Sequence, residues 1–217
     1  MNNEAIKRII SSIIIIPIFI FLISKGSIYF TLFLITFFLI ATYEWINMCK
    51  NKIHSFLGII FLLLSTYFAF LLRGNDSNGL FIFLFVIIIC VATDIGGYIF
   101  GKIFKGPKLT RISPNKTYSG MIGSYFLSIT FAYLFINEYN IFLLNSISFT
   151  QDNIKFFILI FLISTVSQLG DLFISYFKRL SKIKNTGKII PGHGGLLDRV
   201  DGIIFAIPFC YLLFRFI

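Results

Sequence analysis

Residues 79–100 read GLFIFLFVIIICVATDIGGYIF, and this stretch decides the fold class. Its only charged side chain is Asp94. As a helix the stretch would be about 33 Å long at 1.5 Å per residue, which is enough to cross a hydrocarbon core roughly 30 Å thick. A soluble domain does not need so long an apolar run, so the stretch predicts a transmembrane helix.

Six further apolar runs surround this one, and together they make the chain 57% hydrophobic. They cover residues 9–24, 27–43, 55–72, 119–136, 154–177 and 202–217. The first run is followed by further spans and has no small-residue cleavage site, so we expect it to remain as a span and not to be removed as a signal peptide. We therefore predict an all-α polytopic membrane bundle with about seven transmembrane helices.

The chain shows no linker that would divide it, so residues 1–217 are predicted to form a single membrane domain. Within it we distinguish the N-terminal helices of residues 1–78 from a core of residues 79–217, where the candidate catalytic residues discussed below are found. Polar segments at 101–118 and 178–201 are the expected cytoplasmic loops of that core.

Basic residues predict the orientation of the chain. If the N-terminus is cytoplasmic and seven spans alternate, 15 of the 19 lysines and arginines lie on the cytoplasmic side. The exceptions are Lys25, Arg73, Lys155 and Arg215. This bias follows the positive-inside rule and places the C-terminus outside. The net charge of +10 is then explained by topology and by attraction to anionic lipids, and nucleic-acid binding is not expected.

Acidic residues are few, so each position is informative. Five of the nine lie at termini, span ends or loops, where we expect solvated surface: Glu4, Glu44, Asp76, Glu138 and Asp152. Asp171 differs, because it follows an apolar run and lies about 10 Å along the helix from Lys178. A carboxylate at that depth costs on the order of 2–3 kcal/mol unless it is paired, hydrated or metal-bound.

Two readings are open for the polar stripe around Asp171, which includes Ser164, Gln168 and Ser175 at helical spacing. A hydrogen-bonded seam between helices explains the serines and the glutamine. It explains the aspartate poorly, so a functional site is favoured. Asp94 raises the same choice, because the glycines near it also suit close helix packing.

Two loops carry further candidates. Ser113, Lys116 and Thr117 precede a helix start, where hydroxyls, a lysine and free N–H groups can bind phosphate. In the last loop, Asp198 and Asp201 are three residues apart and share a face if a helix begins there. Together with Asp171 they would form an oxygen site suited to Mg²⁺.

The glycines of the last loop allow a backbone to approach a ligand closely, which makes Gly194 and Gly195 candidate binding residues. His193 lies beside them and is a candidate hydrogen-bond donor to phosphate. No second histidine lies nearby in the sequence, so a zinc site is not expected. Arg199 offers a planar fork to phosphate oxygens.

Three segments of the core form an ordered pattern. The longest reads SYFKRLSKIKNTGKIIPGHGGLLDRVD, residues 175–201, and the others are DIGGY at 94–98 and SPNKTYSG at 113–120. Over roughly residues 90–207 this pattern resembles bacterial phosphatidate cytidylyltransferases. The resemblance implies transfer of CMP from CTP to phosphatidate, giving CDP-diacylglycerol and pyrophosphate in phospholipid biosynthesis. It also implies a multi-pass protein of the bacterial inner membrane whose active site faces the cytoplasm.

The resemblance assigns roles to particular residues. Asp171 and Asp198 match the family's metal-binding carboxylates, which implies Mg²⁺ and allows a second, monovalent cation. Asp171, Asp198, Lys178 and Arg179 would be catalytic. The remaining candidates would bind substrate: Asp94, Ser113, Lys116, Thr117, Lys184, His193, Gly194, Gly195, Arg199 and Asp201.

The chain departs from the family pattern at Asn185, where aspartate is usual, and at Asn115 and Ser119, where lysine and glutamate are usual. Expected partners are CTP, phosphatidate and the lipid bilayer, with a homodimer as a further expectation. Two alternatives are a CTP-dependent polyprenol or dolichol-type lipid kinase, and an ion or solute transporter that uses the buried aspartates.

Overall fold

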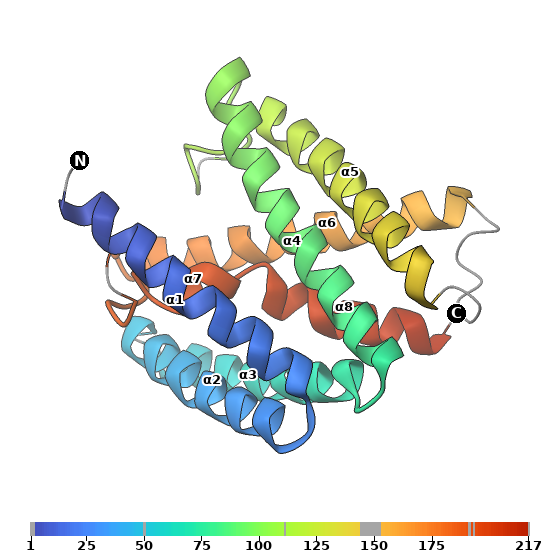
Figure 1. Cartoon of the computed structure of the whole chain (residues 1–217). Coiled ribbons are helices and arrows are strands. Elements are labelled where there is room, and N and C mark those ends of the chain that lie inside the picture. The colour runs from blue at the N-terminus through green and yellow to red at the C-terminus, as the bar shows by residue number, and fades with distance from the viewer. Residues whose placement is uncertain are drawn as a thin grey trace.

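The computed structural model describes residues 3–49, 51–110, 112–143, 153–190, 192 and 194–216. Asp152 and His193 therefore lie outside the described residues. Within the described part the named elements are all helices (Figure 1). They are α1 (Asn3–Lys25), α2 (Ser27–Met48), α3 (Lys52–Arg73), α4 (Ser77–Phe104), α5 (Tyr118–Leu143), α6 (Asn153–Leu180), α7 (Leu197–Val200) and α8 (Ile203–Phe216).

Each of the seven predicted apolar runs corresponds to one helix. Five of these helices, α2 to α6, are long and apolar enough to cross a membrane. The first and last are represented by shorter apolar segments, Ile13–Lys25 and Ile203–Arg215. The prediction of a polytopic helical bundle is confirmed, and α7 is a short additional helix in the last polar loop.

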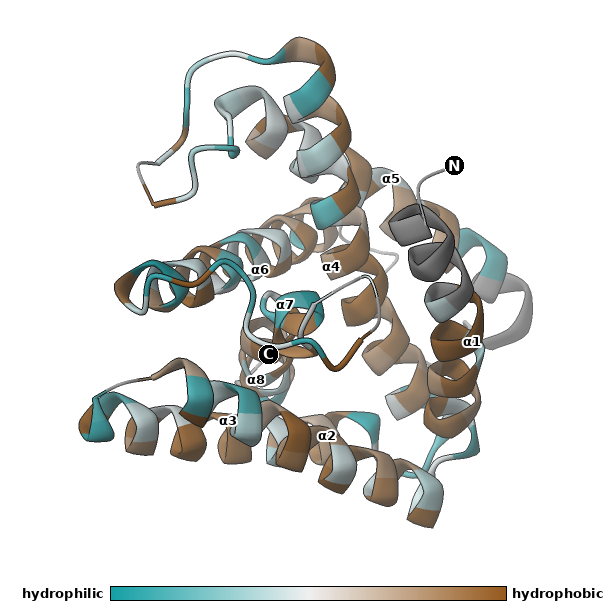
Figure 2. Cartoon of the chain, turned by 90° about the vertical axis from the view of Figure 1, so that its left-hand side faces the viewer, coloured by the Kyte–Doolittle hydropathy of each residue, from teal (hydrophilic) through white to brown (hydrophobic). Residues whose placement is uncertain are grey.

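The long helices run back and forth, so that α1 begins on the left of Figure 1 and α8 ends on the right. The ends of α2 and α6 lie at the same end of the bundle, where a hydrogen bond joins them. Ser181 donates a hydrogen bond from Oγ to the carbonyl oxygen of Met48, at 2.5 Å, and thus joins the ends of α6 and α2. The loops after α4 and α6 contain many hydrophilic residues, whereas the helices are mainly hydrophobic (Figure 2).

Close packing of α4 against α5 depends on glycines. A Cβ on Gly96 would lie 2.4 Å from the carbonyl oxygen of Gly123, and one on Gly120 would lie 2.7 Å from that of Gly97. Real side chains do not tolerate such distances, so these helices approach closely only because these positions carry no side chain. The glycines near Asp94 therefore do allow close helix packing. The polar site described below lies beside these packed helices.

Two apolar clusters hold the bundle together, and the second one supports the last polar loop. In that cluster Trp45 and Met48 of α2 pack with Ile174 of α6 and Leu197 of α7. Leu197 is completely buried. Burying a leucine side chain contributes about 2 kcal/mol, so this residue anchors α7, the short helix that carries Asp198, to the bundle.

The alternating helices predict that the two ends of the chain lie on opposite sides of the membrane. Reporter fusions, with a phosphatase active only outside and a fluorescent protein active only inside, should place the N-terminus in the cytoplasm and the C-terminus outside. The physical reason is the concentration of basic residues in the loops at one end. Two ends found on the same side would contradict the seven-span count.

Candidate functional site

A polar cavity of about 340 Å³ lies between α4, α5, α6 and the segment around α7. Its charged lining is made by four carboxylates and two lysines, namely Asp94, Asp171, Asp198, Asp201, Lys116 and Lys178. Thr117 and Gln168 also line it. The cavity therefore brings together candidate residues from four segments of the chain.

Asp171 is paired with a lysine from the loop between α4 and α5. Lys116 Nζ lies 2.5 Å from Asp171 Oδ2, and Ser175 donates to Asp171 Oδ1 at 3.3 Å. Backbone hydrogen bonds shape the loop that delivers the lysine: the N–H of Leu109 donates to the carbonyl of Lys116, and the N–H of Lys116 to that of Ser113. Asp171 is thus compensated by charge, as its depth in an apolar helix requires.

Lys178 at the end of α6 forms the second ion pair. Its Nζ lies 2.9 Å from Asp198 Oδ1 and 4.0 Å from Asp201 Oδ2. Asp198 lies in the short helix α7 and Asp201 caps its end, and both carboxylates face the same ammonium group. Burial, and then the nearby charge of Asp171, raise the pKa of Asp201 well above its ordinary value.

Asp94, which lies in α4, is the fourth carboxylate of the cavity. It is close enough to Asp171, Lys116 and Arg199 for their charges to interact. Thr93, which also lines the cavity, donates from Oγ1 to Ser164 Oγ of α6 at 2.8 Å. In the polar stripe of α6, Ser164 therefore joins two helices by a hydrogen bond, whereas Asp171 lines the cavity.

Six of the predicted site residues that the structure describes do not line the cavity: Ser113, Arg179, Lys184, Gly194, Gly195 and Arg199. Ser113 shapes the turn before Lys116, and its own N–H donates to Thr110 Oγ1 at 3.2 Å. Arg179 is exposed and donates from Nε to the carbonyl of Ile112, at 3.4 Å. Lys184 is also exposed. Their long side chains would have to turn to reach a ligand in the cavity.

The glycines of the last loop have backbone roles. Gly194 forms an isolated antiparallel bridge with Ile190 and has a φ of +96°, which is strained for other residues. Gly195 donates its N–H to Asp198 Oδ2 at 3.1 Å. Thr186 donates its N–H to the same oxygen at 2.8 Å. Asp198 therefore organises the loop as well as facing Lys178.

Glu44 was missed by the sequence reasoning, which placed it on the solvated surface. That expectation is wrong, because Glu44 is 1% exposed and contacts the last polar loop from α2. A signal was present: Glu44 is the only acid in α2 and shares a helical face with Ala41 and Met48. A lone acid on an apolar face is the same anomaly that marked Asp171.

The donor set of the cavity fits a hard divalent cation. Lysine ammonium groups already occupy positions beside Asp171 and Asp198, so both carboxylates face places where a positive charge is stable. The described residues contain no group of three or more His, Cys, Asp or Glu side chains poised to hold a metal. Mg²⁺ needs fewer protein side chains than that, since it is usually held by one or two carboxylates together with substrate phosphates and water.

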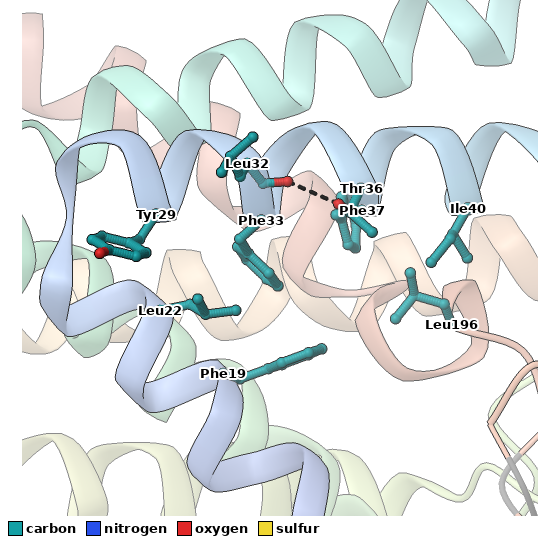
Figure 3. Close-up of a pocket in the computed structure, with 9 residues that line it drawn as sticks. All are labelled: Phe19, Leu22, Tyr29, Leu32, Phe33, Thr36, Phe37, Ile40 and Leu196. Carbon is teal, nitrogen blue, oxygen red and sulfur yellow. Dashed lines mark hydrogen bonds between the residues drawn. The ribbon is translucent and has the colours of Figure 1, made fainter.

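An apolar groove of about 310 Å³ lies between α1 and α2 on the other side of the loop (Figure 3). Its walls include Phe19 and Leu22 of α1, and Phe33 and Ile40 of α2. Leu196, which immediately precedes α7, closes one end. The same loop therefore borders an apolar groove through Leu196 and the polar cavity through Asp198.

Comparison with known proteins relates this chain to one family. Residues 6–73 and 54–217, which overlap, match the cytidylyltransferase family. A phosphatidate cytidylyltransferase of Rickettsia typhi is 38% identical over 205 residues, covering 93% of this chain and 88% of the relative. The enzyme of that name from Rickettsia conorii is 36% identical over 213 residues, covering 95% and 89%. That of Haemophilus influenzae is 38% identical over 144 residues, covering 66% and 49%.

The two ion pairs differ in burial, and this difference predicts unequal effects on stability. The side chains of Lys178 and Asp198 are 11% and 10% exposed, whereas those of Lys116 and Asp171 are 26% and 24% exposed. Lys178→Met should lower the free energy of unfolding by about 3 kcal/mol, because it leaves a buried carboxylate without its cation. Lys116→Met should cost less, since water can reach Asp171.

Thermal unfolding of both variants in the same detergent checks this order. A lower midpoint for Lys116→Met than for Lys178→Met would contradict the assignment of Lys178 as the principal counter-charge of the site.

Proposed function

The chain belongs to the cytidylyltransferase family, and we propose that it is a phosphatidate cytidylyltransferase, which transfers CMP from CTP to phosphatidate and releases pyrophosphate. One observation supports this beyond the family membership. Two lysines and four carboxylates line a single cavity at the polar end of helices whose outer surfaces are apolar. Such a cavity suits a reaction between a highly charged nucleotide and a lipid.

The chemistry requires one bond to form and one to break. A phosphate oxygen of phosphatidate attacks the α-phosphorus of CTP, and the bond from that phosphorus to the bridging oxygen of the β-phosphate breaks as pyrophosphate leaves. The attacking oxygen is already largely ionised near neutral pH, so no general base is needed. Catalysis then depends on positioning the two phosphates and on stabilising their negative charge.

Lys116 and Lys178 are the residues best placed for that charge stabilisation. Their ammonium groups are held in the cavity by Asp171 and Asp198. A lysine binds phosphate as a compact point charge, and it can exchange a carboxylate partner for a phosphate oxygen. Arg199, which already interacts with Asp94, is the third cation close to the carboxylates.

Asp171 and Asp198 would hold Mg²⁺, with a monovalent cation as a further expected ion. When bound, Mg²⁺ supplies positive charge to the reacting phosphates and to the leaving pyrophosphate. Substrate oxygens and water would complete its shell.

We propose that the protein lies in the bacterial inner membrane with this cavity facing the cytoplasm, where CTP is present. Basic residues in the loops at that end support this orientation. A homodimer and the absence of a nucleic-acid partner stay predictions.

Labelled CTP tests the function and separates it from a CTP-dependent lipid kinase. Purified protein with phosphatidate, Mg²⁺ and CTP labelled on the α-phosphate should transfer the label to lipid, whereas label on the γ-phosphate should be released as pyrophosphate. Asp171→Asn should abolish this transfer, because asparagine keeps the shape and loses the charge. Lipid labelled only by the γ-phosphate would indicate a kinase, and wild-type rates in Asp171→Asn would contradict the assigned site.

Asn185, where the family usually has aspartate, provides a second test. It is exposed and does not line the cavity, and its side chain lies beside Gly194. We expect Asn185→Asp to change the rate of CMP transfer by less than about tenfold, or roughly 1.4 kcal/mol in the barrier, because Asp171 and Asp198 already supply two anionic ligands. An inactive wild type together with an Asn185→Asp variant that gains hundreds-fold would show that this departure is a loss of a catalytic group.

A further inference from the structure

Glu44 is a buried carboxylate that the mechanism above does not use. It lies near the end of α2, is 1% exposed and does not line the polar cavity. An unpaired buried carboxylate is costly, so its hydrogen-bond partners indicate what it does.

All of the hydrogen bonds recorded for Glu44 come from the loop that carries Asp198. Its Oε1 accepts from the N–H of Leu196 at 2.9 Å. Its Oε2 accepts from the N–H of Leu197 at 2.9 Å and from Thr186 Oγ1 at 3.0 Å. One side chain thus ties the start of the loop to the start of α7.

Asp198 also connects Thr186 to the residues just before α7. Its Oδ2 accepts from the N–H groups of Thr186 and Gly195. Thr186 is therefore shared, since its hydroxyl donates to Glu44 and its N–H to Asp198. With Oδ2 used in this way, Oδ1 is left to face Lys178 in the cavity.

Two glycines make room for Glu44. A Cβ on Gly187 would lie 2.5 Å from Glu44 Oε1, and one on Gly195 would lie 2.6 Å from Glu44 Oε2. Gly195 is further limited by Thr186 Oγ1, which would be 2.1 Å from its Cβ. The loop can close on the carboxylate only because both positions carry no side chain.

We propose that Glu44 is a positioning residue for CMP transfer: it ties Thr186 to Leu196 and Leu197, at the start of α7, and so places Asp198 beside Lys178 for the substrate phosphates. It acts through the loop and does not touch the substrate. This proposal rests on the proposed function, and one arm of its test does not depend on activity.

The first test compares Glu44→Gln with Glu138→Gln, which removes the same charge at an exposed position. Glutamine keeps the shape of Glu44 but presents an NH₂ group to loop N–H donors, so at least one hydrogen bond is lost. We expect kcat for CMP transfer to fall by tenfold or more, equivalent to about 1.4 kcal/mol, with KM for CTP changed less than about threefold. Amide hydrogen exchange of residues 194–200 should rise at least tenfold, while exchange in α4 stays at the wild-type level.

A milder pair of variants covers the case in which Glu44→Gln does not fold. Thr186→Val removes only the hydroxyl donor, whereas Thr186→Ser keeps it. We expect Thr186→Val to lower kcat and to speed loop exchange, and Thr186→Ser to behave as wild type. In the double variant Glu44→Gln with Thr186→Val, the loss should be smaller than the product of the single losses, because both changes remove the same contact.

Several outcomes would overturn the proposal. Glu44→Gln could match Glu138→Gln in both kcat and exchange, or it could raise KM for CTP with no change in exchange, which would place Glu44 on the substrate. If the wild type itself transfers no CMP, the proposed function fails. The exchange arm still reports whether Glu44 holds the loop.

Discussion

Lys178 contacts the carboxylates of Asp198, at 2.9 Å, and Asp201, at 4.0 Å, and the arrangement of the polar site depends on these contacts. All three side chains are about one-tenth exposed, so a charge left alone there would cost several kcal/mol. Lys178 lies in the last turn of α6, Asp198 lies in α7, and Asp201 lies in the two-residue turn between α7 and α8. One ammonium group therefore joins the end of α6 to α7 and to the turn that leads into α8.

The bilayer explains why this polar site is concentrated at one end of the bundle. Outer faces of the helices are covered with exposed apolar side chains such as Ile28, Leu39 and Phe56, and charged groups lie mainly inside the bundle, in the loops and toward the helix ends. Glu44 extends the site into the N-terminal helices. Through it α2 supports the same loop that Asp198 closes from the other side. The second helix of the chain thus supports the polar site.

The sequence predicted the helices well because a hydrocarbon core of about 30 Å sets the length of every span. It also identified Asp171 and Asp94, since a carboxylate in an apolar helix needs an explanation. Which lysine pairs with which carboxylate could not be predicted, because Lys116 and Asp171 meet only after α4, α5 and α6 have packed. Arg179 and Lys184 show a further limit, since a charge in the right loop does not fix where a long side chain points. Glu44 was missed because its position near a span end suggested solvent, although its helical face was apolar.

We propose that the triphosphate of CTP binds in the cavity between Lys116 and Lys178, and an experimental structure with CTP and Mg²⁺ tests this placement most directly. Phosphate oxygens should contact both lysine ammonium groups, in the cavity lined by Asp94, Asp171 and Asp198. A nucleotide bound elsewhere, with both lysines still paired to Asp171 and Asp198, would contradict it.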